Sequence, residues 1–205
     1  PIVNADVTVA GLFLQPLKAL TMSGNGYDLT VNGSAFINGT MTQTTTNVFQ
    51  TSNLVIAGTG DFYSTGGSSV VRLAGNGSID GKFRMYSAGD VYFQGSGLTF
   101  SGSPTEFTVG DLYVPSGNSA TVNASTFTIR SIPSVDGTFN LNGSLSMNGA
   151  SGTPTLSGLG GTIQATGNVT KSSGTDANFG NNAAGTLSCG RSEEHTSELQ
   201  SPNTI

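Results

Sequence analysis

The sequence predicts an all-β protein, most simply an irregular β-solenoid of the parallel β-helix kind, and three observations carry this prediction. A short unit with the pattern apolar, any, apolar, any, Gly recurs along the chain. Its apolar runs are brief, because Gly, Asn, Ser or Pro soon interrupts each of them. Residues that favour helices are scarce, since Glu106 is the single glutamate before residue 191. Apolar and polar residues that alternate, with many β-branched and aromatic side chains, are typical of strands with one buried face.

The recurring unit sets the spacing of the expected strands. It occurs at residues 29–33, 54–58, 71–75, 91–95, 98–102, 139–143 and 145–149, with close variants at 107–110, 112–114 and 127–129. Asn-Gly pairs, which favour positive φ and tight corners, occur at six places. Very short strands separated by corner residues suit a solenoid, in which about 20 residues per coil would give roughly nine coils over residues 1–190.

Two other architectures stay open, a β-sandwich and an interwoven trimeric β-fibre. A sandwich favours longer strands with turn signals about every 8–12 residues, whereas the glycines that close these units are unevenly spaced. Hydrophobic residues make up 35% of the chain, below the usual share of about 45–50%. A solenoid tolerates this, because its core is expected to be a narrow column of small or medium side chains, and Asn, Ser and Thr can form ladders along its axis.

The chain is expected to contain four segments. Residues 1–23 would form an initial strand and an apolar cap over an exposed coil end, where backbone groups would otherwise lack partners. Residues 24–170 carry the repeats and would form the solenoid. Residues 171–190 lose the pattern, with Phe179 and Leu187 as anchors, and are expected to be a frayed or truncated coil. Residues 191–205 form a separate tail.

The tail, residues 191–205, resembles the translation of a sequencing-library adapter. The run Arg191–Ser201 matches successive codons of that adapter without a break, and residues 202–205 fit its variable index and the constant region that follows. The tail supplies the single histidine, His195. Without it, Lys+Arg falls from 7 to 6 and Asp+Glu from 12 to 9, so the net charge changes from -5 to -3. We expect both true termini to lie elsewhere, and base the functional expectations on residues 1–190.

The composition excludes several classes of function. Scattered cations and a net charge of -5 argue against nucleic-acid binding, and no run of about 18 apolar residues is present to insert into a membrane as a helix. Without a native histidine, a Ser/His/Asp or Cys/His catalytic set cannot form. Cys189 alone supports neither a disulfide nor a zinc site. The sequence therefore predicts no catalytic, cofactor-binding or metal-binding residues and no enzymatic activity.

The acidic residues are candidates for glycoside hydrolysis, which needs two carboxylates within about 10 Å of each other. They are Asp61, Asp80, Asp90, Asp111, Asp136 and Glu106. Each aspartate lies beside a glycine, the ordinary place for a turn aspartate, so we favour turn formation over catalysis. Residues 58–61 resemble a fragment of a calcium-binding repeat, and the Thr-rich runs at 42–46 and 126–128 invite an ice-binding interpretation, but neither pattern repeats regularly. Convergence of Asp80, Asp111 and Arg130 on one concave face would contradict the non-enzymatic interpretation.

Cationic and aromatic residues are the other candidates for contacts with a ligand. The cations Arg72, Lys82, Arg84 and Arg130 are scattered. The tyrosines Tyr63, Tyr86, Tyr92 and Tyr113 are candidates for an exposed strip that stacks on sugar rings. Packing within the strands is the favoured interpretation of these tyrosines.

Residues 28–65, DLTVNGSAFINGTMTQTTTNVFQTSNLVIAGTGDFYST, resemble modules of virion structural proteins and tail fibres of tailed phages. The resemblance implies a structural or adhesive role at the host surface, in the virion or outside the cell. It also implies homotrimers, other virion subunits as partners, and a host polysaccharide or protein as receptor. Residues 139–149 and 155–170 are equally similar to passengers of bacterial autotransporter adhesins. A fragment of a solenoid polysaccharide lyase or hydrolase is the third alternative.

Overall fold

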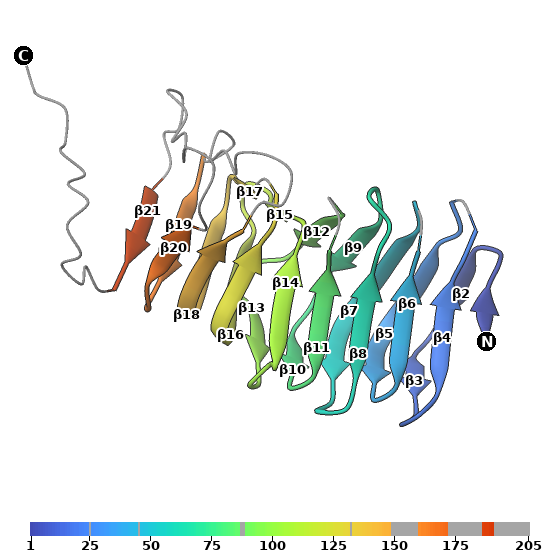
Figure 1. The fold of residues 1–205 in the computed structure, drawn as a ribbon. Helices are drawn as coiled ribbons and strands as arrows, with labels where there is room; N and C mark the ends of the chain where they lie inside the picture. Colours follow the sequence, from blue (N-terminus) through green and yellow to red (C-terminus); the bar gives the residue numbers. More distant parts are fainter. Residues whose placement is uncertain are drawn as a thin grey trace, which may run out of the picture.

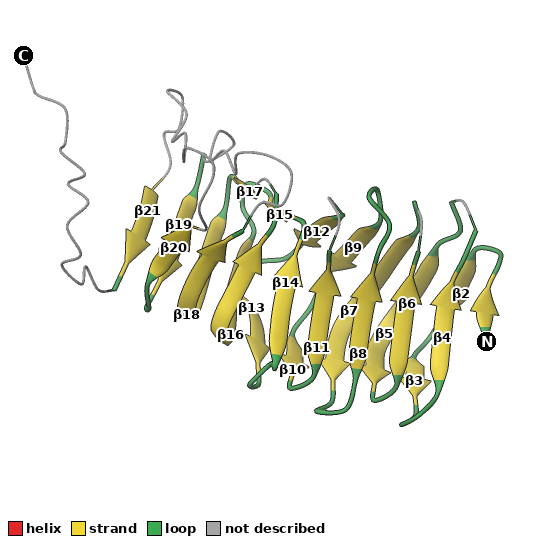
Figure 2. Ribbon diagram, viewed as in Figure 1, coloured by secondary structure: helices red, strands yellow, loops and turns green. Residues whose placement is uncertain are grey.

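The computed structural model describes residues 1–24, 26–44, 46–86, 89–131, 133–148, 160–171 and 186–190. Within this part the chain contains strands and no helix, and all strand pairs are parallel. Strands are joined by short loops and stack into an elongated β-solenoid with three sides (Figures 1 and 2). The all-β solenoid prediction is therefore confirmed, and the sandwich alternative is not observed. No helix in the described residues is long and apolar enough to cross a membrane.

Each turn of the solenoid contributes one strand to each of three stacks, which we call the first, second and third sides. The first side contains β1 (Ile2–Val3), β4 (Ala19–Met22), β6 (Thr40–Gln43), β8 (Asp61–Ser64), β11 (Lys82–Met85), β14 (Glu106–Val109), the second halves of β16 (Ser119–Ile129) and β18 (Thr138–Met147), and β20 (Val169–Lys171). The second side contains β2 (Val7–Val9), the first halves of β5 (Leu29–Ile37) and β7 (Val48–Ile56), β9 (Val70–Leu73), β12 (Asp90–Phe93), β15 (Asp111–Val114) and β17 (Pro133–Val135). The third side contains β3 (Leu12–Leu14), the second halves of β5 and β7, β10 (Gly77–Ile79), β13 (Leu98–Ser101), the first halves of β16 and β18, β19 (Thr162–Ala165) and β21 (Thr186–Cys189). Figure 1 shows the first-side strands β4 to β18 next to one another along the molecule, with second-side strands behind them.

The register of the first side shows how the length of a turn changes. Thr21 aligns with Thr42, then with Tyr63 and then with Arg84, so the step along the sequence is the same from each turn to the next. The following step, from Arg84 to Thr108, is longer. About seven turns have described strands on all three sides. The nine expected are not all seen complete, because the last strands, β18 to β21, are described on the first and third sides only, and residues 149–159 and 172–185 lie outside the described residues.

The corners change along the solenoid. In β5 and β7 one continuous strand bends from the second to the third side, with a register shift between Val31 and Ser34. In β16 and β18 the continuous strand instead bends from the third to the first side, with a shift between Asn123 and Thr126. This change of corner explains the irregular spacing of glycines in the sequence.

Residues 1–23, expected as an initial strand and a cap, form a turn like those that follow. Their strands β1, β2 and β3 pair with β4 and β5 in the same three stacks, so the hydrogen bonds show no boundary near residues 24–26. At the other end, β21 pairs with β19 and extends the third side. Residues 172–185 and the adapter-like tail, residues 191–205, lie outside the described residues.

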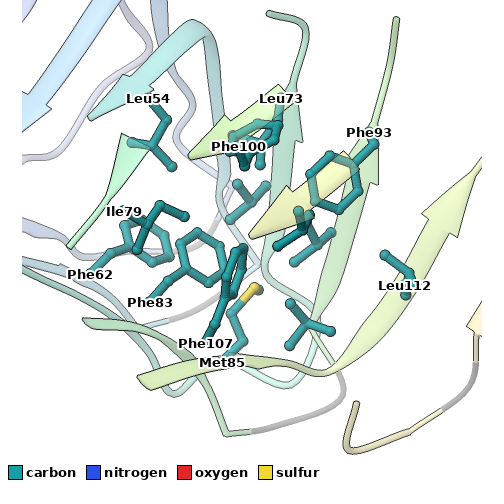
Figure 3. Packing of buried hydrophobic residues seen from close by; sticks show 14 of the residues in the cluster. Leu54, Phe62, Leu73, Ile79, Phe83, Met85, Phe93, Phe100, Phe107 and Leu112 are labelled. Carbon is teal, nitrogen blue, oxygen red and sulfur yellow. The ribbon is translucent and has the colours of Figure 1, made fainter. Parts of the chain in front are cut away.

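The core is filled by large aromatic side chains, which corrects the expectation of small or medium ones. Eight of the eleven phenylalanines are buried. A continuous column runs through Phe49, Phe62, Phe83, Phe107, Phe127 and Phe139, with neighbouring ring centroids 4.8 to 5.6 Å apart. Figure 3 shows Phe62, Phe83 and Phe107 in a row, contributed by successive first-side strands. The expectation was wrong because the space enclosed by three strands is wide enough for a phenyl ring on every turn.

Glycines at the corners permit close contact between successive turns. Gly39, Gly60 and Gly81 form a column at the corner between the third and first sides. A Cβ atom on Gly60 would lie 2.9 Å from Ile56 Cγ2, 3.0 Å from the Ala57 carbonyl oxygen and closer still to the Ile37 carbonyl oxygen of the preceding turn. Close packing, more than positive φ, therefore explains these glycines, although Gly26 and Gly143 do have the positive φ expected of Asn-Gly pairs.

Candidate functional site

Charged and aromatic side chains gather on the outer surface of the first side. Buried and partly exposed residues alternate along β8 and β11, so Asp61, Tyr63 and Arg84 lie on the outer surface. Arg84 Nε donates to Asp61 Oδ1 at 3.0 Å, and a second contact joins Arg84 Nη2 to Asp61 Oδ2. The guanidinium carbon of Arg84 lies 4.7 Å from the ring centroid of Tyr63 and 5.7 Å from that of Tyr86. The ion pair with Asp61 and the contacts with the Tyr63 and Tyr86 rings therefore hold the Arg84 side chain in place, and they join two neighbouring turns.

A second group lies immediately beyond Arg84 along the same side. The Tyr86 hydroxyl donates to Glu106 Oε1 at 2.6 Å, and the Thr108 hydroxyl donates to the same oxygen at 3.2 Å. The hydrogen bond to Glu106, together with burial, raises the pKa of the Tyr86 phenol above its ordinary value. The guanidinium carbon of Arg130 lies 5.1 Å from the Tyr86 ring centroid. Tyr86 is thus in contact with two arginines and one carboxylate.

These residues border a hollow of about 390 Å³, which we call the Tyr86–Arg130 hollow. It is lined by Tyr86, Pro104, Thr105, Glu106, Phe107, Thr108, Ser125, Thr126, Thr128, Arg130 and Asn148. A second hollow of about 350 Å³, around the corner towards the third side, shares Pro104 and Ser125 with the first. Its wall includes an amide ladder, in which Asn142 Nδ2 donates to Asn123 Oδ1 at 2.7 Å. The two hollows together offer hydroxyls, amides, one cation and one carboxylate to an elongated polar ligand.

The second side carries a different group, with two carboxylates. Asp90 and Asp111 are register partners on neighbouring turns, and so are Tyr92 and Tyr113, whose rings stack with centroids 4.5 Å apart. The guanidinium carbon of Arg72 lies 6.0 Å from the ring centroid of Tyr92. Burial, then the nearby Asp90 and Asp111 carboxylates, raises the pKa of Tyr113 to about 12.

The pKa of Asp90 is raised by burial and by the Asp111 carboxylate, against a weak hydrogen bond from the Tyr92 hydroxyl. The folded state therefore binds this proton more tightly than the unfolded state. The contribution of Asp90 to stability falls as the pH rises between its unfolded and folded pKa values, and it is recovered as the pH is lowered.

The structure separates the candidates that the sequence grouped together. The four tyrosines form no single strip, since Tyr63 and Tyr86 belong to the first side and Tyr92 and Tyr113 to the second. All four point outward and contact each other in pairs, so they do not pack in the core.

The aspartates take two kinds of position. Asp80 and Asp136 lie at corners, where Asp80 Oδ1 accepts a hydrogen bond from the Ser103 N–H of the next turn at 2.9 Å. Asp61, Asp90 and Asp111 instead begin strands.

Asp80, Asp111 and Arg130, whose convergence on one concave face would indicate catalysis, do not all lie together. Asp80 lies at the corner between the third and first sides, whereas Arg130 and Asp111 lie at the corner between the first and second sides, where the Ser131 N–H donates to the Gly110 carbonyl oxygen at 3.1 Å. Among the described residues no group of three or more His, Cys, Asp or Glu side chains could hold a metal ion. Asp61, the acid of the calcium-like fragment, is paired with Arg84.

Sequence reasoning missed the joint position of Tyr86, Glu106 and Arg130. A recurring sequence step, close to one solenoid turn, relates Asp90 to Asp111 and Tyr92 to Tyr113 on the second side. No such signal relates Tyr86, Glu106 and Arg130, because their side chains differ in chemistry and their spacing is uneven.

Comparison with known proteins adds no relative: no family model, no curated protein and no solved structure matches the chain significantly.

Proposed function

We propose that the chain is a non-enzymatic structural and adhesive protein, part of a phage tail fibre or another virion component that contacts the host surface. The observation that supports this is the concentration of aromatic, cationic and hydroxyl side chains on one outer side of a regular solenoid. A surface held by hydrogen bonds between successive turns needs little reordering when it binds. Aromatic rings and polar groups in this combination suit contact with sugars.

The partners follow from the same proposal. A host-surface polysaccharide or protein would bind at the first side, other virion subunits would hold the fibre, and the fibre would be a homotrimer. Its location would be the virion, or the cell surface if the chain is instead a bacterial secreted adhesin. Recovery of the gene with its flanks tests this point, since tail genes nearby favour the phage fibre and an outer-membrane anchor favours the adhesin.

One observation favours the enzymatic alternative, a polysaccharide hydrolase. Asp90 and Asp111 are adjacent carboxylates, and the raised pKa of Asp90 is a property that a general acid needs. Neither Asp90 nor Asp111, however, is among the residues that line the two hollows described above. We therefore favour adhesion.

The experiment is a glycan array of bacterial surface polysaccharides, probed with the full chain and followed by an assay for new reducing ends. We expect retention of one or more glycans without cleavage. Release of reducing ends that Asp90→Asn abolishes would instead establish the hydrolase. No retention on the array or on intact bacterial cells would overturn the adhesive proposal.

A further inference from the structure

We propose that the Tyr86–Arg130 hollow binds an acidic sugar residue of a polysaccharide, with the sugar carboxylate on Arg130 and its hydroxyls on Glu106 and the surrounding threonines. This inference rests on the proposed adhesive function and specifies the chemistry of its ligand. It is carried by the charge, the size and the hydrogen-bonding groups of the hollow.

Of the residues that the structure describes, Arg130 is the one cation that lines the hollow, and Glu106 is the one carboxylate. Arg84 is neutralised by Asp61, and Glu106 accepts hydrogen bonds from Tyr86 and Thr108. Among the described residues the Arg130 guanidinium contacts the Tyr86 ring and makes no ion pair. A planar guanidinium stacked on an aromatic ring keeps its N–H edges for a carboxylate, which it can bind with two parallel hydrogen bonds.

The surroundings of Arg130 are more positive than the chain as a whole. Lys82, Arg84 and Arg130 face Asp61 and Glu106 on the first side, so three cations stand against two carboxylates there. Residues 1–190 together have a net charge of -3. An anionic polymer would therefore be attracted to this side in preference to the remainder of the surface.

The size and walls of the hollow suit a sugar. A volume of about 390 Å³ lies at the small end of the range of about 300–1,000 Å³ typical of small-molecule sites. The hydroxyls of Ser125, Thr126 and Thr128 make no hydrogen bonds with other described residues and can donate to, or accept from, a ligand. Glu106 receives hydrogen bonds from the described residues on Oε1 alone, which leaves Oε2 to accept a sugar hydroxyl.

The continuation of the hollow favours a polymer. The second hollow begins at the shared residues Pro104 and Ser125 and is walled by the Asn123–Asn142 amide ladder. A saccharide chain with one acidic residue at Arg130 could thus place its next residue against these amides. An acidic peptide is a poorer fit, because acidic motifs are bound by clusters of arginines, and Arg130 is the one arginine among the described residues that line this hollow.

The test measures binding of the full chain to acidic polysaccharides. The probes are oligomers of galacturonate, alginate, hyaluronate and polysialate, with neutral galactan as the uncharged comparison, measured by calorimetry. We expect at least one acidic probe to bind, galactan to bind at least tenfold more weakly, and Arg130→Gln to weaken the acidic probe at least tenfold. The matched control is Arg72→Gln, which removes an arginine from a tyrosine ring on the second side and should leave affinity within twofold. Far-UV circular dichroism confirms that both variants are folded.

The outcomes separate this inference from the proposed function. Equal effects of Arg130→Gln and Arg72→Gln, or equal binding of galactan and the acidic probes, would overturn the acidic-sugar site while leaving adhesion in place. Competition by poly-glutamate at the same affinity as the best saccharide would overturn a sugar site in favour of an acidic peptide. Absence of binding to all probes, with retention on the glycan array, would refute the acidic-sugar site alone.

Discussion

Replacement of Gly60 by alanine tests whether close contact between turns is the reason for the glycine-rich composition. The new methyl group would meet Ile56 Cγ2 at 2.9 Å, the Ala57 carbonyl oxygen at 3.0 Å and the Ile37 carbonyl oxygen at a shorter distance. To make room, the corner would have to move away from the preceding turn. It is held there by the Ala57 N–H bond to Ile37 O, 3.0 Å, and the Asp61 N–H bond to Gly39 O, 2.9 Å.

The expected cost combines crowding with weakened hydrogen bonds. Overpacking costs about 1–3 kcal/mol, and one lost backbone hydrogen bond costs about 1 kcal/mol. Gly60→Ala should therefore lower the free energy of unfolding by about 2–4 kcal/mol, a fall in Tm of roughly 4–16 °C for a chain of this size.

Gly58 provides a matched control at the same corner. A Cβ atom on Gly58 would meet nothing within 4 Å, and its φ is outside the positive range that disfavours alanine. Gly58→Ala should be neutral or stabilise by about 0.4–1 kcal/mol, because it restricts the unfolded chain. Urea denaturation followed by far-UV circular dichroism measures both variants. Equal midpoints for Gly58→Ala and Gly60→Ala would refute the close-contact explanation.

Three further predictions concern the core, the Asp61–Arg84 pair and the half-buried Asp90 carboxylate. Phe83→Ala, which interrupts the aromatic column between Phe62 and Phe107, should cost about 3–5 kcal/mol in denaturation experiments. Phe13→Ala should cost less than about 1 kcal/mol, because Phe13 is 64% exposed; similar losses would contradict a continuous core. Asp61→Asn should lower stability by about 1 kcal/mol or more, and added NaCl at about 1 M should remove only part of the difference, because the side chains of Asp61 and Arg84 are about four-fifths buried. Asp90→Asn should raise Tm at pH 7 and lose this advantage as the pH falls to about 3.9, since acid protonates the carboxyl group in the native chain as well; a lower Tm at pH 7 would show that the carboxylate is stabilising.

Local sequence patterns were enough to predict the strands but not their arrangement around the axis. Alternation in units such as residues 29–33 and 91–95 identifies β5 and β12, because a strand with one buried face needs that pattern regardless of its neighbours. The number of turns depends on the sequence step between aligned residues. That step is shorter between Thr42 and Tyr63 than between Arg84 and Thr108. The spacing of the glycines does not reveal the step, because the position of the bent corner changes along the solenoid.

The candidate site was hidden for the same reason. Tyr86 follows β11, Glu106 begins β14 and Arg130 follows β16, so they are neighbours only after three turns are stacked. Each residue alone looked like a scattered surface group. Burial of Phe83 and Phe107 beneath them was predictable from alternation, whereas the contacts above were not, because outward positions carry no hydrophobic pattern.

The separation of charge between two sides bears on how a polyanion would meet the protein. The second side places the Asp90 and Asp111 carboxylates next to each other, and their mutual repulsion contributes to the raised pKa of Asp90. The first side carries three cations against two carboxylates. An acidic polysaccharide would therefore be repelled by one side and attracted by the other, which fixes its approach before any hydrogen bond forms. The first and second sides are built from different strands of each turn. Outward residues on one side can therefore be substituted without altering those on the other side or the buried phenylalanine column.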